Sequence, residues 1–346
     1  MNNSLFLIFA LSVKKNSLMR FLTLTVILLS CFSCSTKKQQ NIEDKGEIFH
    51  TFYSVKYQYT HSLKEEIDAE LLRFDNSLNV FNPSSVISKV NNNEAVVLDT
   101  FFINVFNRAQ QVSALSDGLF DITISPMINA WGFGFKNMEH ITPETIDSLR
   151  QLVGYDKIRL KDGYVEKENP KVQINASAIA KGYAVDVIAG LLDRHEIKNY
   201  MVEIGGEIRT KGLSPKGRCW NVGISMPMGK DIFEYGKEQA VVSLCNKAMA
   251  TSGNYRNYYV KDGKKYAHTI DPTTGYPSAK STLSATVIAD DCMTADAYAT
   301  AFMLADTSQV RQMAEKEAID YMLVIGSGDS DYITLKSSRF SEYEYR

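Results

Sequence analysis

Asp296 and Thr300 stand four residues apart in the run 295–305, which is rich in helix-forming residues. That spacing places their side-chain oxygens on one face of a helix, about one turn apart. Mg²⁺ prefers oxygen ligands and is usually held by one or two carboxylates together with substrate phosphates. The pair therefore suggests a magnesium site, although an Asp and a Thr at this spacing more often form a solvated helix face or a cap.

Two further segments supply groups that suit a phosphate substrate. Lys181 lies among small residues between Ala178 and Gly182, so that a phosphate could approach the backbone while the ammonium adds positive charge. His268 precedes the Asp-Pro-Thr-Thr-Gly segment 271–275, in which Pro and Gly favour a turn, and its imidazole could accept a hydroxyl proton near neutral pH. The ordinary alternatives are a surface lysine and a buried histidine satisfied by backbone.

Short motifs occur in a characteristic order over nearly the whole chain after its N-terminus. They occupy residues 81–91, 116–123, 129–134, 175–186, 202–208 and 250–255, followed by the His268 and Asp296 segments. In this order and wording the chain resembles the ApbE family, the FAD:protein FMN transferases, which join the FMN half of FAD through a phosphoester to a threonine of a partner protein.

The resemblance implies a role for particular residues. The Ala178 carbonyl, Asp296 and Thr300 would hold Mg²⁺, and His268 would be the base. The implied FAD site comprises Phe81, Leu119, Phe120, Asp121, Lys181 and the Ile270 backbone. The family usually has an acidic residue six positions before the motif lysine, where this chain has Asn175. An amide still accepts and donates hydrogen bonds but brings no charge, so this departure bears on nucleotide affinity or preference at that position.

Three functions fit these residues. The first is magnesium-dependent transfer of FMN from FAD to an acceptor threonine, with release of AMP and with Lys181 and Mg²⁺ neutralising the pyrophosphate charge. In the second, water replaces the threonine and the chain is an FAD pyrophosphatase giving FMN and AMP. The third is an FAD-binding lipoprotein without turnover. By resemblance, the expected acceptors are flavoprotein subunits of membrane redox complexes of the Rnf or Nqr kind.

The N-terminus resembles a bacterial lipoprotein signal. Arg20 precedes the apolar run 21–29, and Leu28-Leu29-Ser30-Cys31 resembles a lipobox, with Cys34 as the competing lipidation site. Neither this run nor the apolar run 5–13 reaches the ~20 residues needed to span a bilayer. We therefore expect a signal peptide over residues 1–30, with Met19 as an alternative start, a lipidated flexible tether over 31–46 and a single transferase domain over 47–346. The domain would lie in the cell envelope, outside the cytoplasm on the periplasmic side.

The other cysteines and the charge add limited information. Cys219, Cys245 and Cys292 show no metal-ligand spacing, and one pair among them could form a disulfide that the sequence does not identify. We expect Cys292 to be a small buried residue. A formal net charge of −2 without any long basic run argues against a nucleic-acid partner.

Hydrophobic periodicity predicts mixed α and β structure. A helical stripe follows a Ser62–Glu65 capping box, and further helices are expected over 102–115, 178–192 and 295–305. Strands are expected at 52–59, 200–204, 220–224, 240–244, 285–288 and 321–325. Because regular α-then-β alternation is missing, we predict an α+β fold with largely antiparallel sheets. The resemblance implies a T-fold-like architecture with the active site in a cleft between lobes.

For three small motifs, the sequence fits a structural role as well as a functional one. Gly205-Gly206 could contact a nucleotide or form a turn with positive φ. Trp131 could stack on a flavin or anchor the core. The segment 251–254 could bind phosphate through its backbone or be a simple turn.

Overall fold

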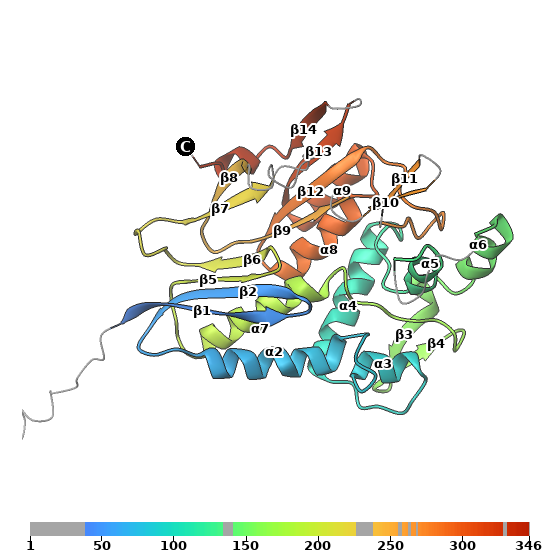
Figure 1. The fold of residues 1–346 in the computed structure, drawn as a ribbon, viewed down its shortest axis with the longest axis horizontal. Coiled ribbons are helices and arrows are strands. Elements are labelled where there is room, and N and C mark those ends of the chain that lie inside the picture. Colours follow the sequence, from blue (N-terminus) through green and yellow to red (C-terminus); the bar gives the residue numbers. More distant parts are fainter. Residues whose placement is uncertain are drawn as a thin grey trace, which may run out of the picture. The chain divides into compact units, whose positions relative to one another are not determined.

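The computed structural model describes residues 39–133, 141–225, 238–254, 258–261, 264–267, 269–327 and 331–345, without the side chains of 238, 239, 258–261 and 264–267. Residues 41–346 form one compact unit, drawn in Figure 1. Within these described ranges, no helix is both long and apolar enough to cross a membrane. The lipidation candidates Cys31 and Cys34, and the whole expected signal peptide, lie outside the described residues.

An eight-stranded sheet runs through the centre of the fold in the order β1-β2-β5-β6-β9-β12-β13-β14 (Figure 1). Every strand pair from β2 to β14 in this order is antiparallel. The α+β fold with largely antiparallel strands is therefore confirmed. The strands are β1 (Gln40–Ile48), β2 (Thr51–Tyr59), β5 (Tyr200–Ile204), β6 (Glu207–Lys211), β9 (Ala248–Gly253), β12 (Thr282–Ala289), β13 (Asp320–Gly326) and β14 (Tyr332–Lys336).

The remaining elements surround this sheet. Three two-stranded sheets pair β3 (Ile158–Lys161) with β4 (Tyr164–Lys167), β7 (Trp220–Ser225) with β8 (Glu238–Leu244), and β10 (Tyr258–Lys261) with β11 (Lys264–Ala267). The helices are α2 (Lys64–Leu78), α3 (Val86–Asn91), α4 (Thr100–Leu115), α5 (Ser125–Ala130), α6 (Pro143–Arg150), α7 (Ala180–Arg194), α8 (Cys292–Phe302) and α9 (Thr307–Glu317), with 3-10 turns η1 (Tyr155–Lys157) and η3 (Phe340–Glu342).

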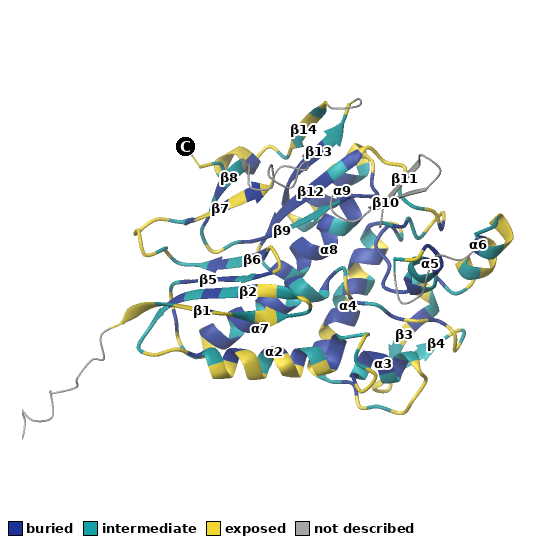
Figure 2. Ribbon diagram, in the orientation of Figure 1, coloured by how far each residue is buried: buried dark blue, intermediate teal, exposed yellow. Residues whose placement is uncertain are grey.

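Side-chain alternation along the strands gives the sheet two apolar faces. Tyr200, Val202 and Ile204 of β5 belong to the main core with α4, α7 and α8, whereas Met201 belongs to a second core with β7, β8 and η3. Successive side chains of a strand point to opposite faces, so one strand supplies both cores. Figure 2 shows both α8 and the strands beside it as largely buried. The sheet is thus a middle layer between helices and a β-hairpin.

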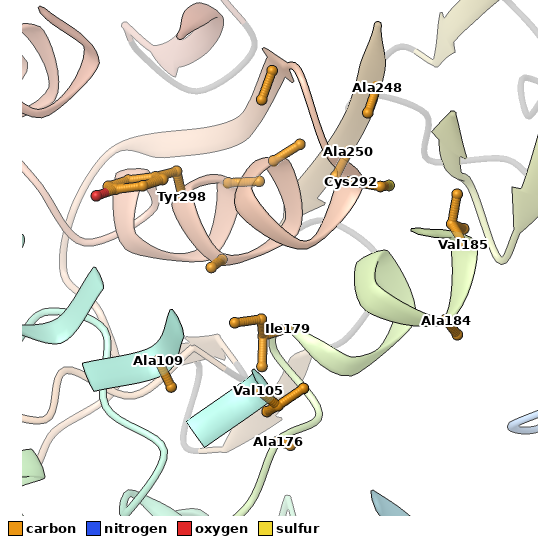
Figure 3. Packing of buried hydrophobic residues seen from close by; sticks show 14 of the residues in the cluster. Val105, Ala109, Ala176, Ile179, Ala184, Val185, Ala248, Ala250, Cys292 and Tyr298 are labelled. Atoms are coloured by element: carbon orange, nitrogen blue, oxygen red, sulfur yellow. The ribbon is translucent and has the colours of Figure 1, made fainter. Parts of the chain in front are cut away.

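Packing in the main core fixes where α7 begins. Ile179, the residue before α7, is fully buried. In Figure 3 it lies between α8 and Val105 of α4. Figure 3 also shows Cys292 at the start of α8, and its fully buried side chain confirms the expectation of a small core residue. Because Ile179 is held on two sides, the first turn of α7 has a defined position.

Two sequence expectations about the N-terminal part are wrong. Residues 40–46, expected to be tether, belong to β1, where buried Asp44 accepts hydrogen bonds from the hydroxyls of Tyr57 (2.6 Å) and Ser62 (2.8 Å). The Ser62–Glu65 capping box does not form. The Ser62 hydroxyl donates to Asp44 and accepts from Lys64 N (3.1 Å), and Leu63 is the N-cap of α2 without a side-chain cap. A polar edge strand has the composition of a linker, which explains the first error.

The other predicted helices and strands are confirmed with shifted ends. The largest shifts are three residues, at the start of β12 and at both ends of α8. α8 begins at Cys292 rather than 295 because the side chain of Asp291 accepts a hydrogen bond from Thr294 N (2.8 Å). The sequence left the disulfide undecided, and the structure joins Cys219 to Cys245 with their Cα atoms 5.0 Å apart. These cysteines flank the paired residues Trp220 and Leu244 of β7 and β8, so the bond closes that hairpin.

Candidate functional site

A cavity of about 420 Å³ opens where the first turn of α7, the start of β6, the end of β9 and the middle of α8 meet. It is lined by the residues predicted around the metal and the phosphates, namely Ala178, Lys181, Asp296 and Thr300. It is also lined by most of those predicted for FAD, namely Leu119, Phe120, Asp121, Asn175 and Ile270. Residues from distant parts of the sequence therefore share one cavity.

A buried charge cluster lies at this cavity. Lys181 Nζ is 2.5 Å from Glu207 Oε1 and 3.9 Å from Asp296 Oδ1. The side chains of Glu207 and Asp296 are each 5% exposed, whereas that of Lys181 is 34% exposed. Two carboxylates thus face one ammonium, and the cluster carries a net negative charge when all three groups are ionised.

The pKa values of the cluster follow from burial and proximity. Burial disfavours the charged ammonium, but the carboxylates of Asp296 and Glu207 outweigh this, so the pKa of Lys181 is raised. Lys181 therefore stays protonated and can attract phosphate. Burial, together with nearby Asp296, raises the pKa of Glu207, while Lys181 works in the opposite direction. A second positive charge in the cavity would relieve the repulsion between the two carboxylates.

Gly182 has a different role from the one its sequence context suggested. A Cβ at this position would lie 2.2 Å from the Cys292 carbonyl oxygen and 2.6 Å from Asp296 Cβ. The glycine therefore lets α7 and α8 approach each other closely and is turned toward α8. The expectation that it admits a phosphate to the backbone is corrected accordingly.

The groups around Asp296 form an oxygen donor set. Asp296 Oδ2 accepts a hydrogen bond from Gly182 N (2.9 Å), which orients the carboxylate. Among the described residues, no backbone N–H donates to the Ala178 carbonyl. Thr300 Oγ1 lies 3.3 Å from Ser252 Oγ across the cavity wall. A carboxylate, a carbonyl and a hydroxyl are hard donors that fit Mg²⁺ in type. In the described part of the chain, no cluster of three or more His, Cys, Asp or Glu side chains has metal-binding geometry.

Asp121 and Asn175 also line the cavity and are held by local turns. Asp121 Oδ1 accepts hydrogen bonds from the backbone N–H (2.7 Å) and the hydroxyl (2.6 Å) of Thr123, and burial raises the pKa of its carboxyl. Asn175 Oδ1 accepts a hydrogen bond from Ser177 N (2.9 Å), and the backbone N–H of Asn175 donates to Ile122 O (2.7 Å). These bonds tie the segment before α7 to the segment around residue 122.

The predicted turn at 271–275 forms and is anchored by Trp131. Asp271 Oδ1 accepts hydrogen bonds from both polar groups of Thr273, and Gly275 N donates to Asp271 O (2.7 Å). Trp131 Nε1 donates to the Gly275 carbonyl (2.8 Å) and shares a small apolar cluster with Ile270. Trp131 is therefore a core anchor beside the cavity, which settles the two readings of its sequence.

The other small motifs also have a place. Gly205 and Gly206 both have positive φ (64° and 105°) and join β5 to β6 as a two-residue hairpin turn, a conformation that favours glycine. Thr251, Ser252 and Gly253 form the end of β9 rather than a turn, and they line the cavity.

Phe81 is the predicted site residue that the structure describes away from this cavity. Phe81 is 60% exposed and borders a separate depression with Pro83 and Asn129, so its expected contact with the flavin is not supported by its position. His268, the candidate base, lies outside the described residues. Its role stays a prediction.

Glu207 is the site residue that the sequence analysis missed. The sequence feature that could have indicated Glu207 is an acidic residue directly after the Gly205-Gly206 pair, at the first position of a strand. The sequence shows the turn but not the contact, because Lys181 reaches Glu207 only after α7 packs on β6.

Comparison with known proteins assigns the family. The sequence model described as "ApbE family" matches residues 49–323. The chain is 34% identical over 333 residues to the FAD:protein FMN transferase of Haemophilus influenzae, covering 91% of this chain and 94% of the relative. It is 33% identical over 304 residues to the FAD:protein FMN transferase of Vibrio cholerae, covering 85% and 90%.

Solved structures agree. The flavin transferase ApbE from Vibrio cholerae superposes with a TM-score of 0.78 at 31% identity, covering 88% of this chain and 99% of that one. The apo flavinyl transferase ApbE of Pseudomonas stutzeri gives a TM-score of 0.78 at 29% identity, covering 88% and 97%. With these matches and the shared antiparallel architecture, the chain belongs to the ApbE family.

Proposed function

We propose that this chain is an FAD:protein FMN transferase that uses Mg²⁺ to move FMN from FAD to a threonine hydroxyl of an acceptor protein and releases AMP. The observation that carries the proposal is the cluster of Lys181, Glu207 and Asp296 at one cavity, in a chain whose relatives bear that activity in their names. A protonated lysine beside an oriented carboxylate suits a pyrophosphate that arrives with a divalent cation.

In the proposed reaction, the threonine oxygen attacks the phosphorus on the FMN side of FAD. A new P–O bond forms to the threonine, and the bond from that phosphorus to the bridging oxygen breaks, so that AMP leaves with the oxygen and its negative charge. Lys181 donates hydrogen bonds to the pyrophosphate and stabilises this charge as it develops. The proton of the threonine passes to a base, for which His268 is the candidate from its place in the sequence.

The Ala178 carbonyl, Asp296 and Thr300 would hold the Mg²⁺. The support is the orientation of Asp296 by Gly182 N, the lack of a backbone donor to Ala178 O in the described chain, and the hydroxyl of Thr300 at the cavity wall. When bound, the ion would neutralise pyrophosphate oxygens and offset the negative charge of the cluster. A single carboxylate among the ligands leaves positive charge for the substrate phosphates.

The acceptors we propose are flavoprotein subunits of membrane redox complexes of the Rnf or Nqr kind, reached from the cell envelope by a chain lipidated at Cys31. The Cys219–Cys245 disulfide supports a compartment outside the cytoplasm, since stable disulfides are rare in reducing compartments. Labelling of cells with a fatty-acid analogue tests the anchor. Cys31→Ala should abolish labelling and Cys34→Ala should retain it, whereas the reverse would move the anchor to Cys34.

Intact-mass analysis of an acceptor domain tests the activity. The chain beginning after Cys34 is incubated with FAD, Mg²⁺ and an acceptor that carries an Asp-x-x-[Ser/Thr]-Gly-Ala-Thr motif. We expect an FMN adduct that disappears with EDTA and with Asp296→Ala, and that persists with Asp290→Ala, whose side chain is 87% exposed. Free FMN and AMP without an adduct would indicate a hydrolase instead, and bound but unchanged FAD a carrier.

A further inference from the structure

Glu207 has one carboxylate oxygen that the protein leaves without a partner. Oε1 binds Lys181 Nζ at 2.5 Å, but Oε2 is buried and makes no hydrogen bond to any residue that the structure describes. Leaving a buried acceptor unsatisfied costs on the order of 1–3 kcal/mol, and more for a charged group, so such atoms are rare in native proteins. An oxygen in this position indicates a ligand that supplies the missing donor.

The position of Oε2 identifies where that donor would come from. The atom would lie 3.4 Å from a Cβ at Gly205, so it sits beneath the tip of the β5–β6 turn. Gly205 and Glu207 both line the cavity that holds Lys181 and Asp296. Oε2 itself is buried, so a donor in the cavity reaches it only when the Glu207 carboxylate turns toward the cavity.

The charges of the site select the chemistry of the donor. An ionised carboxylate oxygen binds either a cation or an N–H or O–H donor. Lys181 already supplies the cation at Oε1, and the proposed Mg²⁺ ligands Ala178, Asp296 and Thr300 would place the second positive charge of the cavity at Asp296 rather than at Oε2. A neutral hydroxyl gives a charge-assisted hydrogen bond without adding charge beside the ammonium.

We propose that Glu207 is a substrate-binding residue that holds Lys181 with Oε1 and accepts a hydrogen bond from a substrate hydroxyl with Oε2. The inference rests on the proposed function, which offers two hydroxyl donors at this cavity: the ribityl chain of the FMN half of FAD, and the threonine of the acceptor. In either case one side chain links the phosphate-binding ammonium to the hydroxyl-bearing part of a substrate, which fixes their relative position.

Binding of two ligands and the KM of the acceptor distinguish a ribityl hydroxyl from the acceptor threonine as the donor. FAD and ADP share an adenosine and two phosphates, but only FAD has the ribityl chain. The dissociation constants of both are measured for the full chain with Mg²⁺, FAD by its fluorescence on mixing and ADP by competition, and the KM of the acceptor is measured by intact mass. The variants are Glu207→Gln, which removes the charge, and Glu207→Asp, which keeps the charge but draws both carboxylate oxygens back by one methylene.

A hydrogen bond to a charged acceptor predicts a change of about 10-fold or more. If the ribityl hydroxyl is the donor, both variants raise the ratio of the FAD to the ADP dissociation constant by that factor. If the threonine is the donor, the ratio stays constant and the acceptor KM rises. The inference is overturned if neither quantity changes, or if FAD and ADP weaken equally, because Glu207 would then act only through Lys181.

Asp193→Asn is the matched control, since it removes a carboxylate that pairs with Lys211 at 2.6 Å outside the cavity. It should alter neither quantity. Thermal melting identifies any variant that fails to fold, and Glu207→Asp keeps the test open if Glu207→Gln does. If the wild type binds FAD and ADP but forms no adduct on the acceptor, the proposed function fails while the FAD-to-ADP ratio still tests Glu207.

Discussion

The backbone N–H of Gly182 donates a hydrogen bond to Asp296 Oδ2 over 2.9 Å, although the residues are 114 positions apart in the chain. This bond joins the first turn of α7, which carries Lys181, to the helix that carries Thr300. It uses an N–H that lies in the first turn of α7, where helical N–H groups have no partner within their own helix. The same contact therefore holds the two helices together and orients the site carboxylate.

Gly182→Ala should disrupt both the packing of α7 on α8 and the orientation of the Asp296 carboxylate. The added Cβ would lie 2.2 Å from the Cys292 carbonyl oxygen. Because this oxygen belongs to the backbone, it cannot move away by a side-chain rotation, and α7 and α8 must move apart. We expect a loss of about 1–3 kcal/mol in the free energy of unfolding, and a loss of FMN transfer that exceeds what the unfolded fraction explains. Urea denaturation and acceptor intact mass measure the two effects.

Gly190 provides the control on the same helix. The nearest atom to a Cβ there is Arg194 Nη1 at 3.9 Å, so Gly190→Ala meets no obstacle and should stabilise the protein by about 0.5–1 kcal/mol. Equal effects of the two substitutions would contradict a special contact at Gly182.

Asn175→Asp should strengthen FAD binding. The aspartate can accept the same hydrogen bond from Ser177 N, so the local turn is kept while a negative charge is added at the cavity wall. A carboxylate is a stronger acceptor for a ribose hydroxyl than an amide. We expect a several-fold lower KM for FAD with kcat unchanged, measured by FMN transfer at varied FAD. A KM that stays the same or rises would show that position 175 does not contact the nucleotide.

Trp131→Phe should weaken FAD binding through the turn at 271–275. The substitution leaves the buried Gly275 carbonyl without its indole donor, which costs about 1–2 kcal/mol of stability, and it loosens the cluster that contains Ile270. The KM for FAD should rise with the loss of stability. Trp220→Phe removes a similar indole bond, to Lys211 O, in the second core. It should reduce stability but leave the KM for FAD unchanged, and the anchoring role fails if both variants change it alike.

Sequence reasoning found the elements whose patterns come from burial. The strand at Trp220 alternates buried and exposed residues without interruption, and it was predicted within one residue of its ends. β9 was missed because its residues, Ala-Met-Ala-Thr-Ser-Gly, are small rather than β-branched. Its Ala248 and Ala250 belong to the buried cluster that also contains α8, so a tertiary contact rather than strand propensity selects them.

The same distinction holds at the cavity. Lys181, Asp296 and Thr300 were identified because their motifs are local in sequence. The partner of Lys181 was not, since Glu207 follows a glycine turn whose appearance is the same in any hairpin. Which carboxylate meets which ammonium depends on how α7 lies on β6, and that orientation is set by buried contacts such as those of Ile179.

The Cys219–Cys245 disulfide should stabilise the protein without affecting the reaction. It closes a segment with a sequence separation of 26, for which restriction of the unfolded chain predicts about 3.5 kcal/mol. Dithiothreitol should lower the melting temperature of the wild type, and it should cause no further shift in a Cys219→Ala/Cys245→Ala variant. FMN transfer at 25 °C should be equal in both, because neither cysteine lines the cavity. Loss of transfer in a folded double variant would contradict this separation.

Because of Lys167, the free energy of unfolding should increase with pH in the alkaline range. Burial lowers the pKa of its ammonium to about 8. Nζ donates to the backbone carbonyls of Val90 (2.7 Å) and Asn91 (3.3 Å) and to Asn93 Oδ1 (3.2 Å), and no ion pair joins it to a carboxylate among the described residues. The unfolded chain keeps the proton up to a pKa of about 10.5. Between these values the unfolded state binds more protons than the folded state, so stability rises with pH.

Urea denaturation of the wild type and Lys167→Met at pH 7 and pH 9.5 measures this effect. The wild type should gain about 1 kcal/mol relative to the variant over that interval, a value reduced from the full shift because the side chain is only half-buried. The variant loses the hydrogen bonds to Val90 and Asn91 at both pH values, which cancels in the comparison. Lys161→Met, at an exposed lysine of β3, should differ from the wild type by the same amount at both. A wild-type advantage that shrinks with pH would reverse the sign and show that the folded state favours the ammonium.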